Sequence, residues 1–269
     1  MIIVAEIGSN HCGSLDLALE HIHAATSAGA DAVKFQLFRA ATLDSRPEVQ
    51  DQLCFYELPL TWLPQLHRTA HDEGLLFICT PFDLGLAQML KGYVDMVKIS
   101  AYDLTYHALI KEAAQLEVPV ILSTAMATWT EIRATLDGPL LNYRDIYLLH
   151  GTACYPAEIK DANLAAIELM IDMYPWCHVG LSDHTLGSEA AVLAMVLGAE
   201  MIEKHFRLDQ IADSPDAFHS ANPEEFRQMV KDIGRTEDIL GSGEKRGPLP
   251  CEMPLFTTCR RTNERPLRG

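Results

Sequence analysis

Short apolar runs rich in β-branched residues alternate with longer segments of helical periodicity along the chain. Such alternation is typical of repeated β-α units, in which helices connect parallel strands. Eight runs fit strands: IIVAEIG (2–8), AVKFQLF (32–38), LLFICTP (75–81), MVKIS (96–100), PVILST (119–124), DIYLLHG (145–151), HVGLSDH (178–184) and MIEKHF (201–206). The spacing predicts helices over 14–30, 61–73, 83–91, 106–117, 129–137, 162–173, 187–198 and 223–240.

Eight strands that are each followed by a helix predict an α/β fold, the closed (β/α)8 TIM barrel. The chain has 269 residues, close to the roughly 250 residues of this fold, so we expect a single barrel. The predicted barrel domain covers 1–247, and 248–269 is predicted to be a C-terminal tail or linker remnant. An open, doubly wound sheet is the alternative, but it usually has fewer strands and a glycine-rich phosphate fingerprint that this sequence lacks.

Composition excludes several classes of partner. Thirty-seven acidic residues against 21 basic ones leave a net charge of −16, which disfavours binding to nucleic acid or to an anionic membrane. The opening residues lack a basic leader, and no run approaches the roughly 20 apolar residues of a membrane span. Seven cysteines without C-x-x-C spacing favour reduced thiols over disulfides or structural zinc. We therefore expect a soluble, cytoplasmic protein.

Polar side chains are concentrated where the predicted strands end. Active sites of TIM barrels lie at the C-terminal ends of the strands, so these residues predict one pocket ringed by all eight. In chain order they are Glu6, Lys34, Gln36, Thr80, Lys98, Ser123, Thr124, His150, Thr152, Ser182, Asp183, His184 and His205.

Each of these residues also has a purely structural interpretation. A lone lysine such as Lys34 or Lys98 is more often salt-bridged or directed toward solvent than bound to a ligand. Alternate strand residues share a face, however, so Lys34 pairs with Gln36 and Glu203 pairs with His205, which favours a site.

Two histidines end adjacent predicted strands. His184 and His205 could therefore meet, and two imidazoles with open positions suit a catalytic divalent metal. We interpret the histidines on predicted helices as surface or packing residues: His21, His23, His67, His71 and His107.

Several motifs together resemble one family. They are AEIGSNHCG (5–13), GADAVKFQLF (29–38), TPFD (80–83), VKISAYD (97–103), PVILSTAMAT (119–128), GLSDHTLG (180–187), GAEMIEKHF (198–206) and LGSGEK (240–245). In this order the chain resembles the sialic acid synthase family, the phosphoenolpyruvate-condensing synthases of N-acetylneuraminate, legionaminate and pseudaminate. The resemblance covers essentially the whole chain.

The resemblance implies a reaction and a set of site residues. Family members join phosphoenolpyruvate to the aldehyde of an open-chain N-acetylated hexose, which gives a nonulosonic acid and phosphate. By motif, the phosphate and carboxylate of phosphoenolpyruvate would be held by Lys34, Lys98, Thr80, Ser123 and Ser182. The remaining implied contacts are His184 and His205 for Mn2+, with Mg2+ or Co2+ as alternatives, Asp103 for the attacking water, and Glu6, Gln36, Tyr155 and Asp216 for the sugar. Lys98, Glu6 and Asp103 are the implied catalytic residues.

The sequence departs from the family pattern at a few positions. Ala101 replaces a phosphate-binding serine, and Tyr102 replaces a glycine, which we expect to narrow the pocket. An amide or hydroxyl is lost at Ala153, and the family histidine after Asp216 is Ala217. The family's small antifreeze-like domain is expected to be missing after 248–269. A homo-oligomer or a separate antifreeze-like partner protein is therefore predicted.

Two alternatives to this function are open. The first is another phosphoenolpyruvate–aldehyde reaction that makes 3-deoxy-ulosonates from sugar phosphates. It would need further basic residues for the second phosphate, and only Arg39, Arg207 and Lys160 are plausible donors. The second is a non-catalytic barrel that serves as a binding or regulatory module, which Ala101 and Tyr102 favour.

Overall fold

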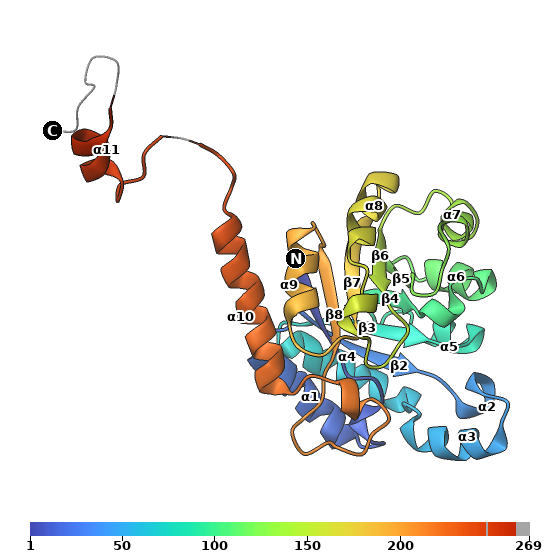
Figure 1. The fold of residues 1–269 in the computed structure, drawn as a ribbon. Helices are drawn as coiled ribbons and strands as arrows, with labels where there is room; N and C mark the ends of the chain where they lie inside the picture. The colour runs from blue at the N-terminus through green and yellow to red at the C-terminus, as the bar shows by residue number, and fades with distance from the viewer. Residues whose placement is uncertain (246, 262–269) are drawn as a thin grey trace. The chain divides into compact units, whose positions relative to one another are not determined.

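The computed structural model describes residues 1–245 and 247–261 and contains a closed barrel of eight parallel strands (Figure 1). Each strand pairs with the next in chain order, and the last pairs with the first. The strands are β1 (Ile2–Glu6), β2 (Ala32–Leu37), β3 (Leu76–Pro81), β4 (Met96–Ile99), β5 (Val120–Ser123), β6 (Ile146–Gly151), β7 (His178–Asp183) and β8 (Met201–His205). The predicted TIM barrel is confirmed.

The strands alternate their side chains between the barrel interior and the surrounding helices. A small interior cluster forms the floor of the barrel: Val4, Ala32, Ile78, Met96, Ile121, Leu149 and Met201. Neighbouring strand residues such as Val33, Phe77 and Ile202 belong instead to the large apolar cluster outside the sheet. Both faces are therefore buried, which explains why the strands read as nearly continuous apolar runs.

Helices follow the strands where the periodicity predicts them, with ends shorter by a few residues. They are α1 (Leu15–Ala28), α4 (Leu63–Asp72), α5 (Leu84–Met89), α6 (His107–Ala114), α7 (Trp129–Asp137), α8 (Ala165–Met173), α9 (Glu189–Val196) and α10 (Pro223–Leu240). Local capping fixes several ends. The side chain of Ser14 accepts from the backbone of α1, and Thr128 and Glu131 form a capping box on α7.

Further short helices occupy the connections and the C-terminal segment, and all of them except η3, which overlaps the helix predicted over 61–73, were not predicted from the sequence. Those of α type are α2 (Ala40–Leu43), α3 (Pro47–Leu53) and α11 (Met253–Cys259). The 3-10 helices are η1 (Gly8–His11), η2 (Cys54–Tyr56), η3 (Leu60–Trp62), η4 (Ala101–Asp103), η5 (Ile159–Asp161) and η6 (Ala217–His219). Three of these helices lie in loops that follow strands: η1 after β1, η4 after β4 and η6 after β8. All three carry residues at or next to the site.

The chain divides into two compact units, Met1–Thr236 and Glu237–Gly269. The first holds the whole barrel, and the division falls within α10. The predicted boundary after residue 247 stays a prediction, and residues 262–269 of the predicted tail lie outside the described residues.

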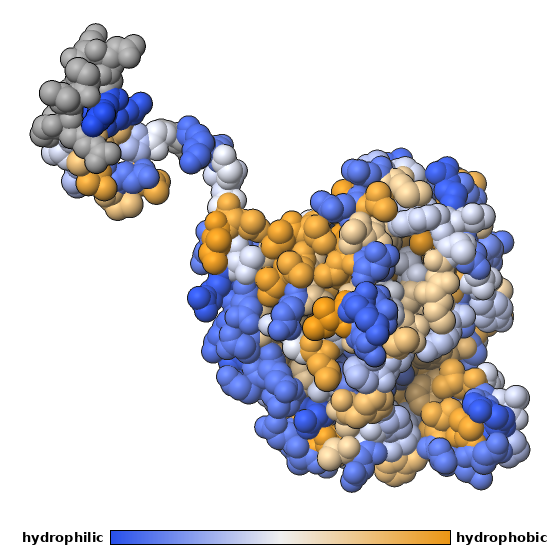
Figure 2. Space-filling model, in the orientation of Figure 1, coloured by the Kyte–Doolittle hydropathy of each residue, from blue (hydrophilic) through white to orange (hydrophobic). Residues whose placement is uncertain are grey.

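Apolar side chains are exposed over α9, as Figure 2 shows. Leu193 is 54% exposed and Val196 is 43% exposed, whereas Ala191 and Ala194 on the same helix are fully buried. Exposed apolar patches are common at contact surfaces, and the predicted homo-oligomer stays a prediction. Among the described residues, no helix combines the length and apolar character needed to span a membrane.

Candidate active site

A polar layer lies directly above the apolar floor of the barrel. Because alternate residues share a face, the residue two positions beyond each floor residue also points inward. On six strands that residue is polar: Glu6, Lys34, Thr80, Lys98, Ser123 and Glu203. All six line one pocket, together with Gln36, Phe82, Ser100, Ala101, Ala125, Tyr155, Ser182, His184 and His205.

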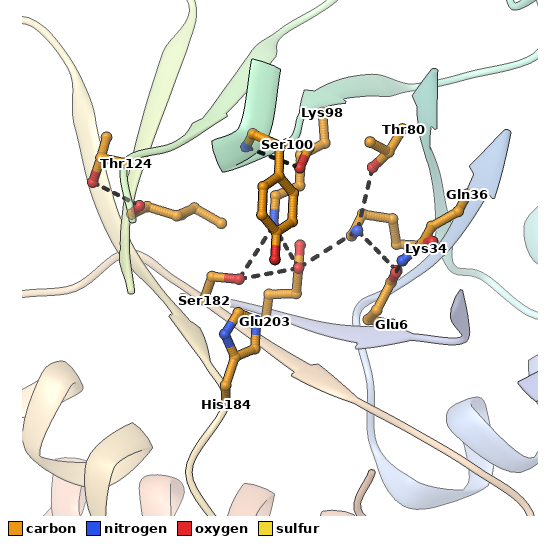
Figure 3. A network of polar contacts seen from close by, with 12 residues as sticks. Glu6, Lys34, Gln36, Thr80, Lys98, Ser100, Thr124, Ser182, His184 and Glu203 are labelled. Carbon is orange, nitrogen blue, oxygen red and sulfur yellow. Dashed lines mark hydrogen bonds and ion pairs between the residues drawn. The ribbon is translucent and has the colours of Figure 1, made fainter. Parts of the chain in front are cut away.

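Lys34 on β2 lies between two carboxylates (Figure 3). Its Nζ is 2.9 Å from Glu6 Oε2 and 3.5 Å from Glu203 Oε1, and it donates to Thr80 Oγ1 at 3.3 Å. Gln36 Nε2 donates to the other Glu6 oxygen at 2.7 Å. Burial lowers the pKa of Lys34, but Glu203 and Glu6 outweigh burial and raise it overall. The two carboxylates therefore favour the charged form of Lys34.

Lys98 on β4 shares the same carboxylate. Its Nζ is 2.5 Å from Glu203 Oε1 and 3.3 Å from Ser182 Oγ, and Ser182 in turn donates to Glu203 at 3.2 Å (Figure 3). Burial lowers the pKa of Lys98 to about 8, although Glu203 opposes the shift. The two lysines overcome burial and lower the pKa of Glu203 to about 2. One carboxylate thus holds two ammonium groups side by side.

Two histidines stand beside this network. His184 Nδ1 is 2.7 Å from the carbonyl oxygen of Thr152, which fixes the ring and leaves Nε2 for a ligand. The ring centroids of His184 and His205 are 5.7 Å apart, and Tyr155 packs on His184 at 4.2 Å. Burial lowers the pKa of His184 to about 4 and that of His205 to about 3, so both imidazoles are neutral at pH 7. Neutral imidazoles with a free nitrogen fit a divalent metal.

Asp216 is held in position by hydrogen bonds from Ser9, which lies in the loop after β1. Its Oδ2 accepts from the backbone nitrogen and the hydroxyl of Ser9, both at 2.7 Å. Gly8 has a φ of +52°, and a Cβ at this position would lie 2.3 Å from Asp216 Oδ2. A glycine is therefore required beside this carboxylate for both conformation and space.

The segment after β4 carries two of the departures from the family pattern. Ala101 lines the pocket, whereas the Tyr102 side chain is 64% exposed and is not part of the lining. The expectation that Tyr102 narrows the pocket stays a prediction. Asp103 is half-buried outside the lining, burial raises its pKa, and its Oδ2 has no hydrogen-bond partner in the described chain.

Four polar residues at strand ends serve the scaffold and not the pocket. Asp183 forms an ion pair with Lys204 at 2.6 Å and accepts hydrogen bonds from Thr185. These contacts lie outside the barrel interior. The other three each bond a backbone carbonyl and do not line the pocket: Thr124, His150 and Thr152. The prediction that these four side chains line the pocket is wrong. Successive residues of a strand point to opposite faces of the sheet, and these four point away from the barrel interior.

The sequence-based site omitted Glu203, although this residue links both lysines. The alternation within MIEKHF indicated that Glu203 shares a face with His205, and that signal alone could have included it. Ser100 and the apolar residues Phe82 and Ala125 also line the pocket without having been predicted. None of the three donors considered for a second phosphate lines it: Arg39, Lys160 and Arg207.

Fold and pocket together define a TIM-barrel protein with a polar pocket, lined by two buried lysines and two buried glutamates, at the C-terminal ends of its strands. The chain belongs to the NeuB family, whose model matches residues 21–245.

Individual relatives agree with this assignment. The chain is 37% identical to an N,N'-diacetyllegionaminic acid synthase of Legionella pneumophila, over 97% of this chain and 78% of that protein. It is 35% identical to a pseudaminic acid synthase of Campylobacter jejuni, over 91% of this chain and 76% of that protein. A solved N-acetylneuraminic acid synthetase from Leptospira borgpetersenii superposes with a TM-score of 0.87 at 33% identity, covering 97% of this chain and 93% of that one.

Proposed function

We propose that the protein condenses phosphoenolpyruvate with the aldehyde of an open-chain, N-acetylated amino sugar. In this reaction, C3 of phosphoenolpyruvate bonds to the aldehyde carbon, water adds at C2, and phosphate leaves by cleavage of its C–O bond. The products are a nonulosonic acid and inorganic phosphate. The observation that carries the proposal is the pair of buried ammonium groups, Lys34 and Lys98, held in one pocket by Glu203.

The cationic side of the pocket suits phosphoenolpyruvate. Two ammonium groups with nearby hydroxyls offer charge-assisted hydrogen bonds to phosphate and carboxylate oxygens. Lys34 and Lys98 would supply the charge, and the hydroxyls are those of Thr80, Ser123 and Ser182. Their burial excludes water, which strengthens these contacts. Because the protein has a net negative charge, it needs a local group of positively charged side chains to bind an anion.

The histidines and the remaining polar side chains of the pocket suit the acceptor and the metal. His184 and His205 are proposed to bind a divalent ion, Mn2+ in the first instance, which when bound would polarise the aldehyde as a Lewis acid. Buried His205 Nδ1 has no hydrogen-bond partner among the described residues, which supports His205 as a metal ligand because buried polar atoms are normally paired. Gln36, Tyr155 and Asp216 are proposed to contact the sugar.

Two carboxyl groups are proposed to move protons. Burial raises the pKa of Glu6 despite the opposing effect of Lys34, and burial also raises the pKa of Asp103. A carboxyl with a raised pKa exchanges a proton more readily near neutral pH. Asp103 would position or deprotonate the attacking water. Glu6, whose carboxylate contacts Lys34, would be the second group that transfers a proton.

Phosphate release tests the proposal. The protein would be assayed with phosphoenolpyruvate, Mn2+ and one aldehyde at a time: N-acetylmannosamine, its phosphate, diacetamido-hexoses and short aldoses. We expect release that depends on an amino-sugar acceptor and is lost in Lys98→Met but kept in Lys111→Met, which removes an exposed lysine. Turnover of sugar phosphates alone would favour a 3-deoxy-ulosonate synthase. No release with any acceptor would favour a non-catalytic barrel.

A further inference from the structure

Two histidines on α4 form an imidazole pair outside the pocket. His67 and His71 are four residues apart, so their side chains lie on one face of the helix. Their ring centroids are 4.0 Å apart. The segment HRTAH (67–71) has the histidine spacing of the zinc-binding H-E-x-x-H helix, but Arg68 stands where that motif has its general base. The spacing therefore suits metal binding without hydrolytic chemistry.

A carboxylate completes this group. Asp95 directly precedes β4, so it lies at the N-terminal ends of the strands, whereas the pocket lies at their C-terminal ends. His71 Nε2 is 2.8 Å from Asp95 Oδ2. One potential ligand atom from each of His67, His71 and Asp95 lies within 4.8 Å of the other two. A metal with bonds of about 2.1 Å holds neighbouring ligands roughly 3–4 Å apart, so small side-chain rotations would bring all three onto one ion.

The scaffold orients two of these three groups. Asp95 Oδ2 accepts from the backbone nitrogen of Phe77 at 2.7 Å, and the backbone nitrogen of Asp95 donates to the backbone oxygen of Phe77 at 2.9 Å. The His67 ring packs edge-on against the rings of Phe77 and Tyr93, with centroids 6.1 and 6.5 Å away. Outer contacts of this kind position metal ligands in proteins.

The second imidazole distinguishes this group from a simple hydrogen-bonded pair. An exposed histidine paired with a carboxylate also occurs at His23 and Glu73, which are 2.8 Å apart. Among the described residues, that pair has no third potential ligand within reach, whereas His71 and Asp95 have His67. The hydrogen bond between His71 and Asp95 does not need His67, but a three-ligand metal site does. The two interpretations therefore predict different results when His67 is replaced.

The electrostatic surroundings favour a bound cation. His71 lies in the last turn of α4, where the free carbonyl groups of a helix carry partial negative charge. The Asp95 carboxylate adds a full negative charge beside it, and the chain as a whole has a net charge of −16. Such a charge distribution attracts cations to the surface.

We propose that His67, His71 and Asp95 form a metal site separate from the pocket, which binds a divalent ion of the zinc class and ties α4 to the loop before β4. Two imidazoles and a carboxylate suit Zn2+, and water can fill the fourth position. An ion that binds only the folded chain stabilises it, so the role of the site is structural. The inference does not depend on the proposed function, because none of the three residues lines the pocket.

Zn2+ binding to the whole chain tests the proposal. All variants would carry His205→Gln, so that one of the ligands proposed for the pocket is absent throughout. His67→Gln removes the imidazole that the hydrogen-bonded pair does not need, and His67→Phe does so while it keeps a ring for packing. His71→Gln removes the second imidazole. The matched control is His23→Gln, which removes an exposed histidine that has only a carboxylate partner.

Calorimetry would give the Zn2+ affinity, and urea midpoints with Zn2+ or with chelator would give its effect on stability. We expect both His67 variants and His71→Gln to weaken Zn2+ binding by at least about tenfold, because loss of even an outer contact typically weakens binding 10- to 100-fold. Zn2+ should raise the urea midpoint of the parent and of His23→Gln, and it should raise that of the His67 variants less. Parental Zn2+ affinity in either His67 variant, or a parent whose midpoint does not respond to Zn2+, would overturn the proposal.

Discussion

Two faces of β8 carry buried ion pairs of opposite character. On the outer face, Lys204 Nζ lies 2.6 Å from Asp183 Oδ2 and donates to the backbone oxygen of Thr185 at 2.7 Å, while Asp183 Oδ1 accepts twice from Thr185. On the inner face, Glu203 Oε1 is shared between Lys34 and Lys98, and its Oε2 has no hydrogen-bond partner among the described residues.

The difference separates a structural pair from a binding site. The outer pair satisfies its oxygens and ammonium within the scaffold, so it has little capacity left for a ligand. The inner network pairs Lys34 and Lys98 with the carboxylates of Glu203 and Glu6, leaves Glu203 Oε2 without a hydrogen-bond partner among the described residues, and lines the pocket. A buried ion pair by itself is therefore weak evidence of function. Buried polar atoms that lack a hydrogen-bond partner and line a pocket are stronger evidence of a binding site.

Breaking the outer pair should produce the largest loss of stability. Lys204→Met leaves the Asp183 carboxylate buried without its cation, which should lower the free energy of unfolding by about 3–5 kcal/mol. The urea midpoint would report this change. Adding Asp183→Asn should recover part of the loss, because the buried charge is then absent. A midpoint equal to that of the wild type would show that the two faces do not differ in this way.

Breaking the inner network should affect stability less. Glu203→Gln leaves Lys98 without its carboxylate, but the pKa of Lys98 is already lowered to about 8 by burial. Lys98 can therefore lose its proton at neutral pH, at about 1.4 kcal/mol per pKa unit. We expect a loss of about 1–2 kcal/mol in the same urea experiment, the cost of deprotonating Lys98 at pH 7. A loss as large as that of Lys204→Met would contradict this distinction.

Ligand binding at the inner face should also depend on pH. Because the lowered pKa of Lys98 is about 8, its charge is present below pH 8 and is lost above it. The affinity for phosphoenolpyruvate should then fall by up to about tenfold for each pH unit above 8. Calorimetry between pH 7 and 9.5 would measure it, with Lys98→Met as a variant whose profile should be flat. Constant wild-type affinity up to pH 9.5 would exclude a charged Lys98 as a ligand contact.

Sequence periodicity predicted the barrel because each element depends on local patterns. All eight strands begin within one residue of their predicted starts. The helices α2 and α3 were missed because they are short, and α3 buries none of its residues, so no apolar period indicates it. Periodicity arises from burial, and elements without a buried face leave no such signal.

The site was less predictable than the fold. Lys34, Lys98 and Thr80 could be placed because strand ends face the active site of a barrel. The role of Glu203 depends on β2, β4 and β8 meeting in space, and no spacing along the chain encodes that meeting. His219 was not predicted as a neighbour of the site, because its contact with His205 arises from the path of a loop.

The most direct test of the inner face as an anion site is the affinity of phosphoenolpyruvate for Lys98→Met, measured by calorimetry at pH 7. Removing one charge-assisted contact should weaken binding by about 1.5–3 kcal/mol, roughly 10- to 150-fold. Lys111→Met, which removes an exposed lysine on α6, should bind as the wild type does. An unchanged dissociation constant in Lys98→Met would assign Lys98 a structural role like that of Lys204 and contradict the proposed site.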